Sequence, residues 1–345
     1  MRGIPHIAKQ MIKNNILAAI GQTPLVELTR IFKDLDVRFF AKLEQLNPGG
    51  STKDRPALNI IEHGLESGAI RKDTVIIESS SGNMGIGLAQ VCSYHKLRFI
   101  CVVDTKTTPQ NISLLQAYNV EVEIVREPDP ETGEYLPARI QRVKQLMQVH
   151  KNSFWPNQYA SPLNAGAHHQ TMHEIVTALD GRLDYLFCAT STCGTLRGCA
   201  EYRDKHKLKT KIIAVDAVGS IIFGGKKCKR LIPGHGAAIV PPLYRAGLAD
   251  ECVHVTDLEC VVACHSLVEE EALLAGGSSG AIIAAVQRFA PRLFPGAVCA
   301  AVLADRGERY LDTIYSPQWI KERFGEITHL WKAPAEVYEC ATATY

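Results

Sequence analysis

The sequence predicts an α/β fold with a mostly parallel sheet, for three reasons. After residue 36, short apolar or β-branched runs alternate with longer amphipathic stretches, which is the pattern of strands alternating with helices. Gly, Asn, Ser or Pro stands at the joins between them, as expected of turns. Runs such as Ile-Ile-Ala-Val at 212–215 are apolar throughout, which is typical of a strand buried on both faces of a parallel sheet.

The individual elements follow from these patterns. Strands are expected at 37–43, 74–78, 97–103, 121–125, 185–189, 211–216 and 297–303. Helices are expected at about 54–66, 83–95, 109–118, 137–149, 168–179, 195–206, 258–274, 280–290 and 308–314. The longest irregular segment is 219–242, and a loop of that length inside a compact domain is usually functional or mobile.

Composition and charge exclude several classes of protein. The 345 residues are enough for about two domains. With 46% apolar and 21% charged residues, the composition is that of a folded globular chain, not of a disordered or collagen-like one. Lys and Arg number 38 against 36 Asp and Glu, and no long basic run is present, so nucleic acid is not expected as a partner.

The cysteines and the N-terminal region favour a cytoplasmic location. The eleven cysteines are an odd number, and most stand in apolar runs, so we interpret them as small buried hydrophobic residues. No Cys-x-x-Cys pair occurs, and Cys260 and Cys264 have no further ligand at metal spacing, so no metal site is expected. The apolar run at 16–20 is too short for a signal peptide or a membrane span, and no membrane contact is expected.

Turns of small residues join an expected strand to an expected helix in three places. They are Ser-Ser-Ser-Gly-Asn-Met-Gly-Ile-Gly at 79–87, Ser-Thr-Cys-Gly-Thr at 191–195 and Gly-Gly-Ser-Ser-Gly at 276–280. Ligands of open α/β sheets bind at the carboxyl ends of strands, so these turns would line a common cleft. The first could hold a carboxylate and the second a phosphate, because helix N-termini attract anions. Each turn taken alone could equally be a helix cap or a loop.

The segment Asn-Pro-Gly-Gly-Ser-Thr-Lys-Asp-Arg-Pro at 47–56 changes this balance. A lysine in a loop is ordinarily a solvated surface charge. Together with the three turns in this order and Gly-Gln-Thr-Pro-Leu at 21–25, however, the Lys53 segment resembles the cysteine synthase and cystathionine β-synthase family of fold-type II pyridoxal phosphate enzymes. The resemblance covers about residues 17–315. It implies the fold of tryptophan synthase β, with two open, mostly parallel sheets flanked by helices.

The resemblance also implies a role for each matching residue. Lys53 would form the Schiff base with pyridoxal 5'-phosphate, Asn83 would bond the ring hydroxyl, and Ser278 would bond the pyridine nitrogen. The cofactor phosphate would be held by Ser191, Thr192, Cys193, Gly194 and Thr195. The substrate would be held by Ser80, Ser81, Gly82, Met84, Gln158, Tyr159 and Gly219.

The reaction implied by the resemblance is a β-replacement on an activated L-serine. The Lys53 amine, once freed by the substrate, would remove the α-proton as a general base. The β-substituent would then leave, and a nucleophile would add at the β-carbon. Arg139, on an expected helix, could hold a phosphate leaving group with two parallel bonds, although a solvated helix face is the more usual meaning of such a charge.

Departures from the commonest cysteine synthase pattern indicate the substrates. Ser191 and Cys193 replace glycines, Tyr159 replaces Phe, the third turn reads Gly-Gly-Ser rather than Gly-Ile-Ser, and 303–312 carries Arg where Ser is common. This combination resembles the branch of the family that joins O-phospho-L-serine to L-glutamate, giving N-(2-amino-2-carboxyethyl)-L-glutamate for 2,3-diaminopropionate and siderophore biosynthesis. A homodimer is implied. The alternatives are a sulfide-using cysteine synthase or a cystathionine β-synthase, a serine or threonine dehydratase, and a non-catalytic regulatory partner.

The chain has no polar linker, so we expect the domains to meet at a hinge. Pro156, Ser161 and Pro162 interrupt two helical patterns and mark this hinge. The expected division is an N-terminal domain at 1–160, a C-terminal domain at 161–325 that carries the phosphate turn, and a tail at 326–345. The N-terminal domain would contain a mobile small subdomain at about 83–158, and about the first 45 residues would pack on the C-terminal domain.

Overall fold

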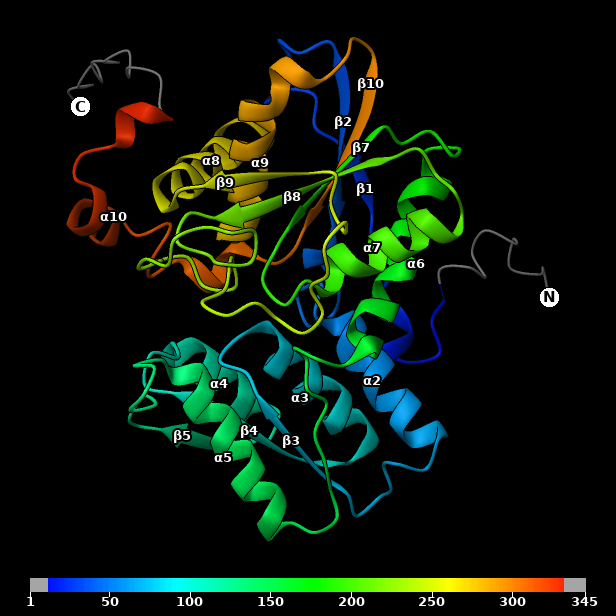
Figure 1. The fold of residues 1–345 in the computed structure, drawn as a ribbon, viewed down its shortest axis with the longest axis vertical. Helices are drawn as coiled ribbons and strands as arrows, with labels where there is room; N and C mark the ends of the chain where they lie inside the picture. The colour runs from blue at the N-terminus through cyan, green and yellow to red at the C-terminus, as the bar shows by residue number, and fades with distance from the viewer. Residues whose placement is uncertain (1–11, 332–345) are drawn as a thin grey trace, which may run out of the picture.

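Two β-sheets organise the chain in the computed structural model, which describes residues 12–331 (Figure 1). The larger sheet has the strand order β1-β2-β10-β7-β8-β9, and only β1 runs antiparallel to its neighbour. Its strands are β1 (Leu25–Glu27), β2 (Val37–Leu43), β7 (Tyr185–Ala189), β8 (Lys211–Ala217), β9 (Glu251–Val255) and β10 (Ala297–Leu303). We call this sheet and its helices the large lobe.

The smaller sheet has the order β5-β4-β3-β6 and is parallel throughout. Its strands are β3 (Val75–Ser79), β4 (Arg98–Asp104), β5 (Glu121–Val125) and β6 (Ser153–Phe154). We call this sheet and its helices the small lobe. The expected α/β fold with two mostly parallel sheets flanked by helices is therefore confirmed.

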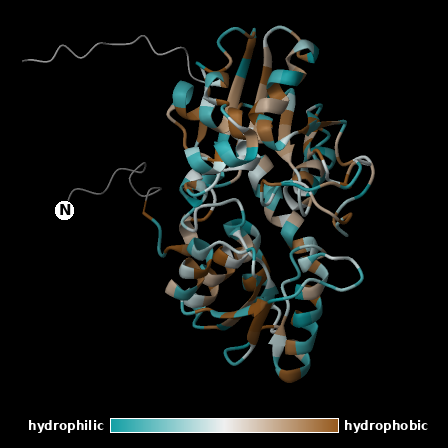
Figure 2. Ribbon diagram, turned by 90° about the vertical axis from the view of Figure 1, so that its left-hand side faces the viewer, coloured by the Kyte–Doolittle hydropathy of each residue, from teal (hydrophilic) through white to brown (hydrophobic). Residues whose placement is uncertain are grey.

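Helices cover both faces of each sheet, which is why the central strands are apolar on both sides. The helices are α2 (Asp54–Glu66), α3 (Asn83–His95), α4 (Pro109–Ala117), α5 (Tyr135–Val149), α6 (Pro162–Ala178), α7 (Gly194–Lys205), α8 (Asp257–Glu271), α9 (Gly277–Phe289) and α10 (Pro317–Phe324). In the large lobe, α8 and α9 share one apolar core with the sheet, and α6 and α7 share another on the opposite face. In the small lobe, α2 and α3 cover one face and α5 the other. Figure 2 shows apolar residues concentrated on the strands of both lobes.

Several expected elements differ from the structure. Residues 308–314 do not form an α-helix; a short 3-10 helix, η4 (Gly307–Tyr310), stands there, and α10 follows it. Helix α6 begins at Pro162 and not at 168, because a proline fits the first turn of a helix, where no N–H partner is lost. The strands β1, β6 and β9 were not expected. Two of them have three residues or fewer, too short to show a period.

The first two strands of the chain, β1 and β2, belong to the large lobe, and the strands of the small lobe follow them in the sequence. Strand β2 pairs in parallel with β10, which is about 260 residues later in the sequence. The small sheet begins with β3, which precedes residue 83, the expected start of the small subdomain. Residues 1–11 and most of the expected tail, 332–345, lie outside the described residues. Within 12–331, no helix has the length and hydropathy needed to cross a membrane.

Candidate active site

A cavity in the large lobe brings together the residues that three separate segments supply. It is lined by Lys53 from the segment after β2, by the turn at 191–195 after β7, and by Ser278 in the first turn of α9. Thr52, Ala189, Gly234, Val302 and Ala304 complete the lining. Strands β2, β7 and β10 are parallel neighbours, so their carboxyl ends meet at one edge of the sheet. The cavity lies at that edge, where α/β sheets bind ligands.

Lys53 is the cavity's candidate nucleophile. It directly precedes α2, and its side chain is only partly exposed. Burial lowers the pKa of the Lys53 ammonium, against the opposing pull of Asp305 and Glu44. The Lys53 Nζ has no hydrogen bond to any of the described residues. A desolvated, unpaired amine is more readily deprotonated and can therefore attack a carbonyl.

The turn at 191–195 stands at the N-terminus of α7 and lines the cavity. Cys193 has a left-handed backbone with φ +64°, an uncommon conformation for a residue other than glycine, and its side chain is buried in a small apolar cluster. A Cβ on Gly194 would lie 2.3 Å from Asn164 Oδ1, so glycine is needed there. At a turn of this kind, the free N–H groups of the helix N-terminus can bind an anion, and no cationic side chain is needed. Thr195 Oγ1 lies 3.3 Å from His168 Nε2.

The turn at 79–84 stands between β3 and α3 in the small lobe and is not among the residues that line the cavity. Ser80 Oγ accepts a hydrogen bond from the Gly85 N–H at 3.0 Å. Gln158 Nε2 donates to the Ser79 carbonyl at 3.0 Å, so Gln158 lies against this turn. Ser81, Gly82 and Asn83 are partly exposed.

Met84 and Gly219 are placed differently from the other expected substrate residues. The Met84 side chain is 1% exposed and packs in the core between α2 and α3, so only its backbone can face a ligand. Gly219 has φ +94°, and a Cβ there would lie 2.5 Å from Cys228 Sγ. Gly219 is buried against its own loop and does not line the cavity.

Arg139 is buried and is not part of a solvated helix face. It lies on α5 with 8% exposure, and its Nε is 3.4 Å from Asp104 Oδ2. The Nε and Nη1 atoms have no hydrogen-bond partner among residues 12–331. Burial raises the pKa of the Tyr159 hydroxyl, and Arg139 acts in the opposite direction, so the two side chains are close enough to interact. A buried guanidinium with free donors is a candidate site for an anion.

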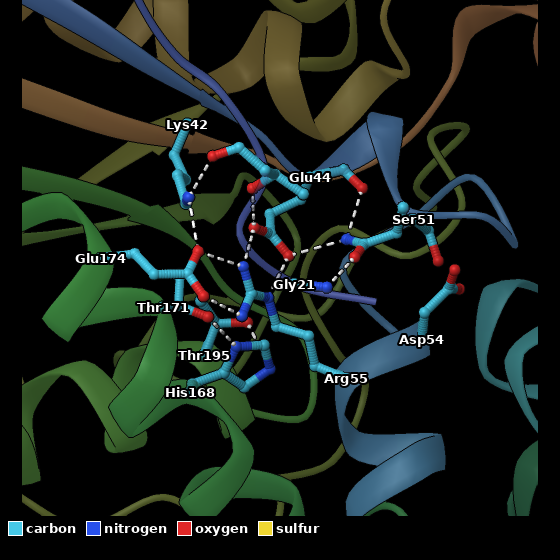
Figure 3. A network of polar contacts seen from close by, with 12 residues as sticks. Gly21, Lys42, Glu44, Ser51, Asp54, Arg55, His168, Thr171, Glu174 and Thr195 are labelled. Carbon is cyan, nitrogen blue, oxygen red and sulfur yellow. Dashed lines mark hydrogen bonds and ion pairs between the residues drawn. The ribbon is translucent and has the colours of Figure 1, made fainter. Parts of the chain in front are cut away.

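A buried ionic network supports the lysine segment (Figure 3). Arg55 on α2 donates to both oxygens of Glu44 and to both oxygens of Glu174 on α6. Lys42 lies 2.6 Å from the Glu174 carboxylate. His168, on α6 six residues before Glu174, bonds Thr171 and Thr195. Burial holds the pKa of His168 well below its ordinary value, so the ring is neutral. Helix α6 therefore carries both Glu174, which bonds Arg55 at the start of α2, and His168, which bonds Thr195 in the turn at 191–195.

The sequence reasoning did not single out several residues of the site. Asp305 and Arg309 contact Asn83, and Asn164 Nδ2 donates to the Gln158 carbonyl at 2.6 Å and to Thr192 Oγ1 at 3.4 Å. Asp305 could have been found, because it follows the carboxyl end of the 297–303 strand, as the turns follow theirs. Asn164 and the Glu44 network carry no local signal, because their partners are distant in sequence.

These features define the class of protein. One cavity is lined by a partly buried lysine without a hydrogen bond, by the N-terminus of a helix and by a serine. These residues fit pyridoxal 5'-phosphate, because they offer an amine for its aldehyde, N–H donors for its phosphate and a hydroxyl for its pyridine nitrogen. The site is that of a fold-type II pyridoxal phosphate enzyme.

Comparison with known proteins gives the family. Residues 16–305 match the family described as "Pyridoxal-phosphate dependent enzyme", and the chain belongs to it. The chain is similar to an O-acetylserine dependent cystathionine beta-synthase from Helicobacter pylori (33% identity, 89% of this chain and 100% of that one, TM-score 0.81). It is also similar to a cysteine synthase from Entamoeba histolytica (32%, 89% and 92%, 0.83). An O-ureido-L-serine synthase matches at 27% identity, over 91% and 97%, with TM-score 0.82.

The expected cofactor and family are thereby confirmed. The family's cofactor is pyridoxal phosphate, and the chain is a member of the cysteine synthase group, whose reactions are β-replacements. The particular substrates are not decided by these similarities, because the related enzymes have different ones in their names.

Proposed function

We propose that the chain replaces the phosphate of O-phospho-L-serine with the amino group of L-glutamate. The products would be N-(2-amino-2-carboxyethyl)-L-glutamate and phosphate. The observation that carries this proposal is the buried Arg139, whose Nε and Nη1 have no hydrogen-bond partner among the described residues. An acetyl ester is neutral and needs no such partner, whereas a phosphate dianion is held best by a guanidinium.

Bound pyridoxal phosphate supplies an electron sink for loss of the α-proton and of the β-substituent. We propose that Lys53 carries the cofactor and, once displaced by the substrate amine, accepts the α-proton at Nζ. The lowered pKa of Lys53 suits this role because burial favours the neutral amine, which can accept a proton. Residues 191–195 would hold the cofactor phosphate, and Ser278 would face the pyridine nitrogen.

The substrate would be held between the two lobes. The Ser80, Ser81 and Gly82 turn would bind the substrate carboxylate with Gln158 beside it. Asn83 would donate to the cofactor's ring oxygen. Arg139 and Tyr159 would hold the leaving phosphate, so that the β-carbon–oxygen bond breaks as the phosphate departs. The glutamate nitrogen would then form the new bond to the β-carbon and release a proton, while the α-proton returns from Lys53.

The remaining expectations belong to this proposal. The product is a precursor of 2,3-diaminopropionate, so we propose a role in siderophore biosynthesis, in the cytoplasm, by a homodimer. No nucleic acid or membrane takes part in this reaction.

Sulfide is the second candidate nucleophile. It is favoured by similarity to a cysteine synthase at 32% identity. Against it, one neighbour is named for O-ureido-L-serine, a β-substituted product without sulfur, so the fold accepts other nucleophiles.

The test is a product assay with two donors and two nucleophiles. The purified holoenzyme is incubated with O-phospho-L-serine or O-acetyl-L-serine, each with L-glutamate or sulfide, and the products are identified by mass. The proposal expects the glutamate adduct from O-phospho-L-serine as the fastest reaction. Cysteine as the faster product from both donors would overturn it in favour of the sulfide-using alternative.

A further inference from the structure

The Asn83 side chain is held from two sides by residues of the other lobe. Asn83 is the first residue of α3 in the small lobe. Its Nδ2 donates to Asp305 Oδ2 at 2.7 Å, and its Oδ1 accepts a hydrogen bond from Arg309 Nη1. Asp305 and Arg309 both follow β10, in the large lobe. The contact therefore joins the two lobes at the cleft.

The chemistry of these partners determines which way the amide faces. A guanidinium has only donors, so the Asn83 atom that meets Arg309 must be the oxygen. A carboxylate accepts hydrogen bonds, so the Asn83 atom that meets Asp305 must be the nitrogen. The nitrogen carries two N–H groups and Asp305 uses one of them. One N–H donor on the Asn83 nitrogen therefore remains for a ligand.

Asp305 is itself fixed in place. It is 2% exposed, and its Oδ2 also accepts a hydrogen bond from the Tyr310 hydroxyl at 2.5 Å. A Cβ on Gly276 would lie 2.1 Å from Asp305 Oδ1, and the Gly276 N–H donates to the Asp305 carbonyl at 3.1 Å. Asp305 thus packs against the loop that leads to Ser278.

Arg309 links Asn83 to the segment that carries Lys53. Besides Asn83, it donates to the Gly49 carbonyl, four residues before Lys53. Its neighbour Arg306 contacts the same segment but not Asn83: Arg306 is exposed, and its Nε donates to the Gln45 carbonyl at 2.9 Å. The two arginines therefore form a matched pair for an experiment.

We propose that Asp305 is a positioning residue that turns the Asn83 amide so that its remaining N–H faces the cofactor's ring oxygen, with Arg309 holding the amide oxygen. A donor at this place stabilises the negatively charged ring oxygen, so the proton stays on the nitrogen that links Lys53 to the cofactor. This inference rests on the proposed role of Asn83 and is independent of which nucleophile the enzyme uses.

The test measures the cofactor, without turnover. Apo-protein of the wild type, Asp305→Asn, Arg309→Lys, Asn83→Ala and the Asn83→Ala/Asp305→Asn double variant is titrated with pyridoxal phosphate. Arg306→Lys is the matched control, and thermal unfolding of each apo-protein shows whether it is folded. The readouts are the dissociation constant and the ratio of the yellow band to the near-ultraviolet band, which reports whether the ring oxygen is charged.

We expect Asp305→Asn and Arg309→Lys to shift the spectrum from the yellow band to the near-ultraviolet band. We also expect them to weaken cofactor binding about fivefold to tenfold, the scale of one ordinary hydrogen bond. Arg306→Lys should match the wild type. In the Asn83→Ala background, Asp305→Asn should cause no further spectral change, because Asp305 acts through Asn83.

The outcomes separate this inference from the proposed function. If Asn83→Ala leaves both readouts unchanged, Asn83 does not contact the ring oxygen, and the proposed role of Asn83 falls together with the inference. If Asn83→Ala changes them but Asp305→Asn and Arg309→Lys do not, only the inference is overturned. An equal effect of Asp305→Asn with and without Asn83 also overturns it. If Asp305→Asn does not fold, the result for Arg309→Lys decides whether the inference stands.

Discussion

The Arg55 guanidinium donates to both carboxylate oxygens of Glu44, at 2.6 and 2.8 Å, and both side chains are buried. Arg55 stands two residues after Lys53, and the pair joins the turn that follows β2 to helix α2. Because Arg55 also bonds Glu174 on α6, the backbone that carries Lys53 is fixed to the large lobe.

Breaking this buried pair should destabilise the protein strongly. Glu44→Gln leaves the Arg55 charge only partly compensated, and loss of one partner of a buried ion pair typically costs about 3 to 5 kcal/mol. The free energy of unfolding in urea measures this. The matched control is Glu27→Gln, which breaks an exposed pair with Arg38 and should cost less than about 1 kcal/mol. Equal losses for the two variants would contradict the structural role of the network.

Replacement of Lys53 should abolish covalent attachment of the cofactor. Among the residues that line the cavity, Lys53 alone carries an amine, so Lys53→Ala leaves the cofactor aldehyde without a partner. Borohydride treatment followed by mass spectrometry should find no reduced cofactor adduct in Lys53→Ala and one adduct in the wild type. A reduced adduct on another lysine of the variant would refute the assignment of Lys53.

Arg139 should distinguish the two leaving groups. If it holds the phosphate, Arg139→Ala should lose about 1.5 to 3 kcal/mol of transition-state stabilisation on O-phospho-L-serine, the scale of a hydrogen bond to a charged group. The value of kcat/KM on O-acetyl-L-serine should change little. Arg142→Ala is the control, since Arg142 lies on the same helix but pairs with Glu123. Equal losses on both esters would show that Arg139 does not recognise the leaving group.

Two helical glycines, Gly198 on α7 and Gly166 on α6, should respond in opposite directions to the same substitution. A Cβ on Gly198 would lie 2.1 Å from the Ala165 carbonyl oxygen, so Gly198→Ala must push α7, which carries the phosphate turn, away from α6. We expect a loss of about 1 to 3 kcal/mol and weaker cofactor binding. A Cβ on Gly166 would meet only Asn59, at 3.9 Å, so Gly166→Ala should stabilise α6 by about 0.5 to 1 kcal/mol. Thermal unfolding with and without cofactor measures both effects.

Glu78 should make stability fall as the pH rises. Burial raises the pKa of the Glu78 carboxyl to about 7, although it accepts hydrogen bonds from Ser79, Trp155 and Gln158. Between pH 4.5 and about 7 the folded protein keeps a proton that the unfolded chain releases. The free energy of unfolding should therefore decrease across this range, by up to about 3 kcal/mol from this group.

Glu78→Gln should remove most of this decrease, because an amide does not titrate. Urea unfolding at several pH values from 4.5 to 8 measures the slope. Glu62→Gln, at an exposed position on α2, should keep the wild-type slope. A slope that is the same in Glu78→Gln as in the wild type would show that Glu78 is charged in the folded protein throughout.

The sequence was sufficient to predict the order and type of most elements. Strands at 37–43, 121–125, 185–189 and 297–303 and helices at 54–66 and 83–95 have the predicted bounds, because each combines a clear hydrophobic period with turn residues at its ends. The same local chemistry predicted that the turns at 79–87 and 191–195 stand where a strand ends and a helix begins. The prediction was wrong for the turn at 276–280, which follows helix α8 and opens α9 with no strand before it.

Only the tertiary structure decided which of these segments meet. Nothing local in 37–43 shows that it pairs with 297–303, since strand pairing depends on contacts far apart in the chain. From the sequence alone, Arg139 could belong to a solvated helix face or could bind a ligand, because a charge pattern does not reveal what covers a helix.

The sequence by itself determined the fold class, the cofactor family and the position of Lys53, because these depend on local patterns and a specific motif. The tertiary structure decided that Met84 packs in the core, that Arg139 is buried beside Tyr159 and that Asp305 and Arg309 hold Asn83. These are properties of how separate segments pack, and packing sets burial, hydrogen-bond partners and pKa values through atoms that are distant in sequence.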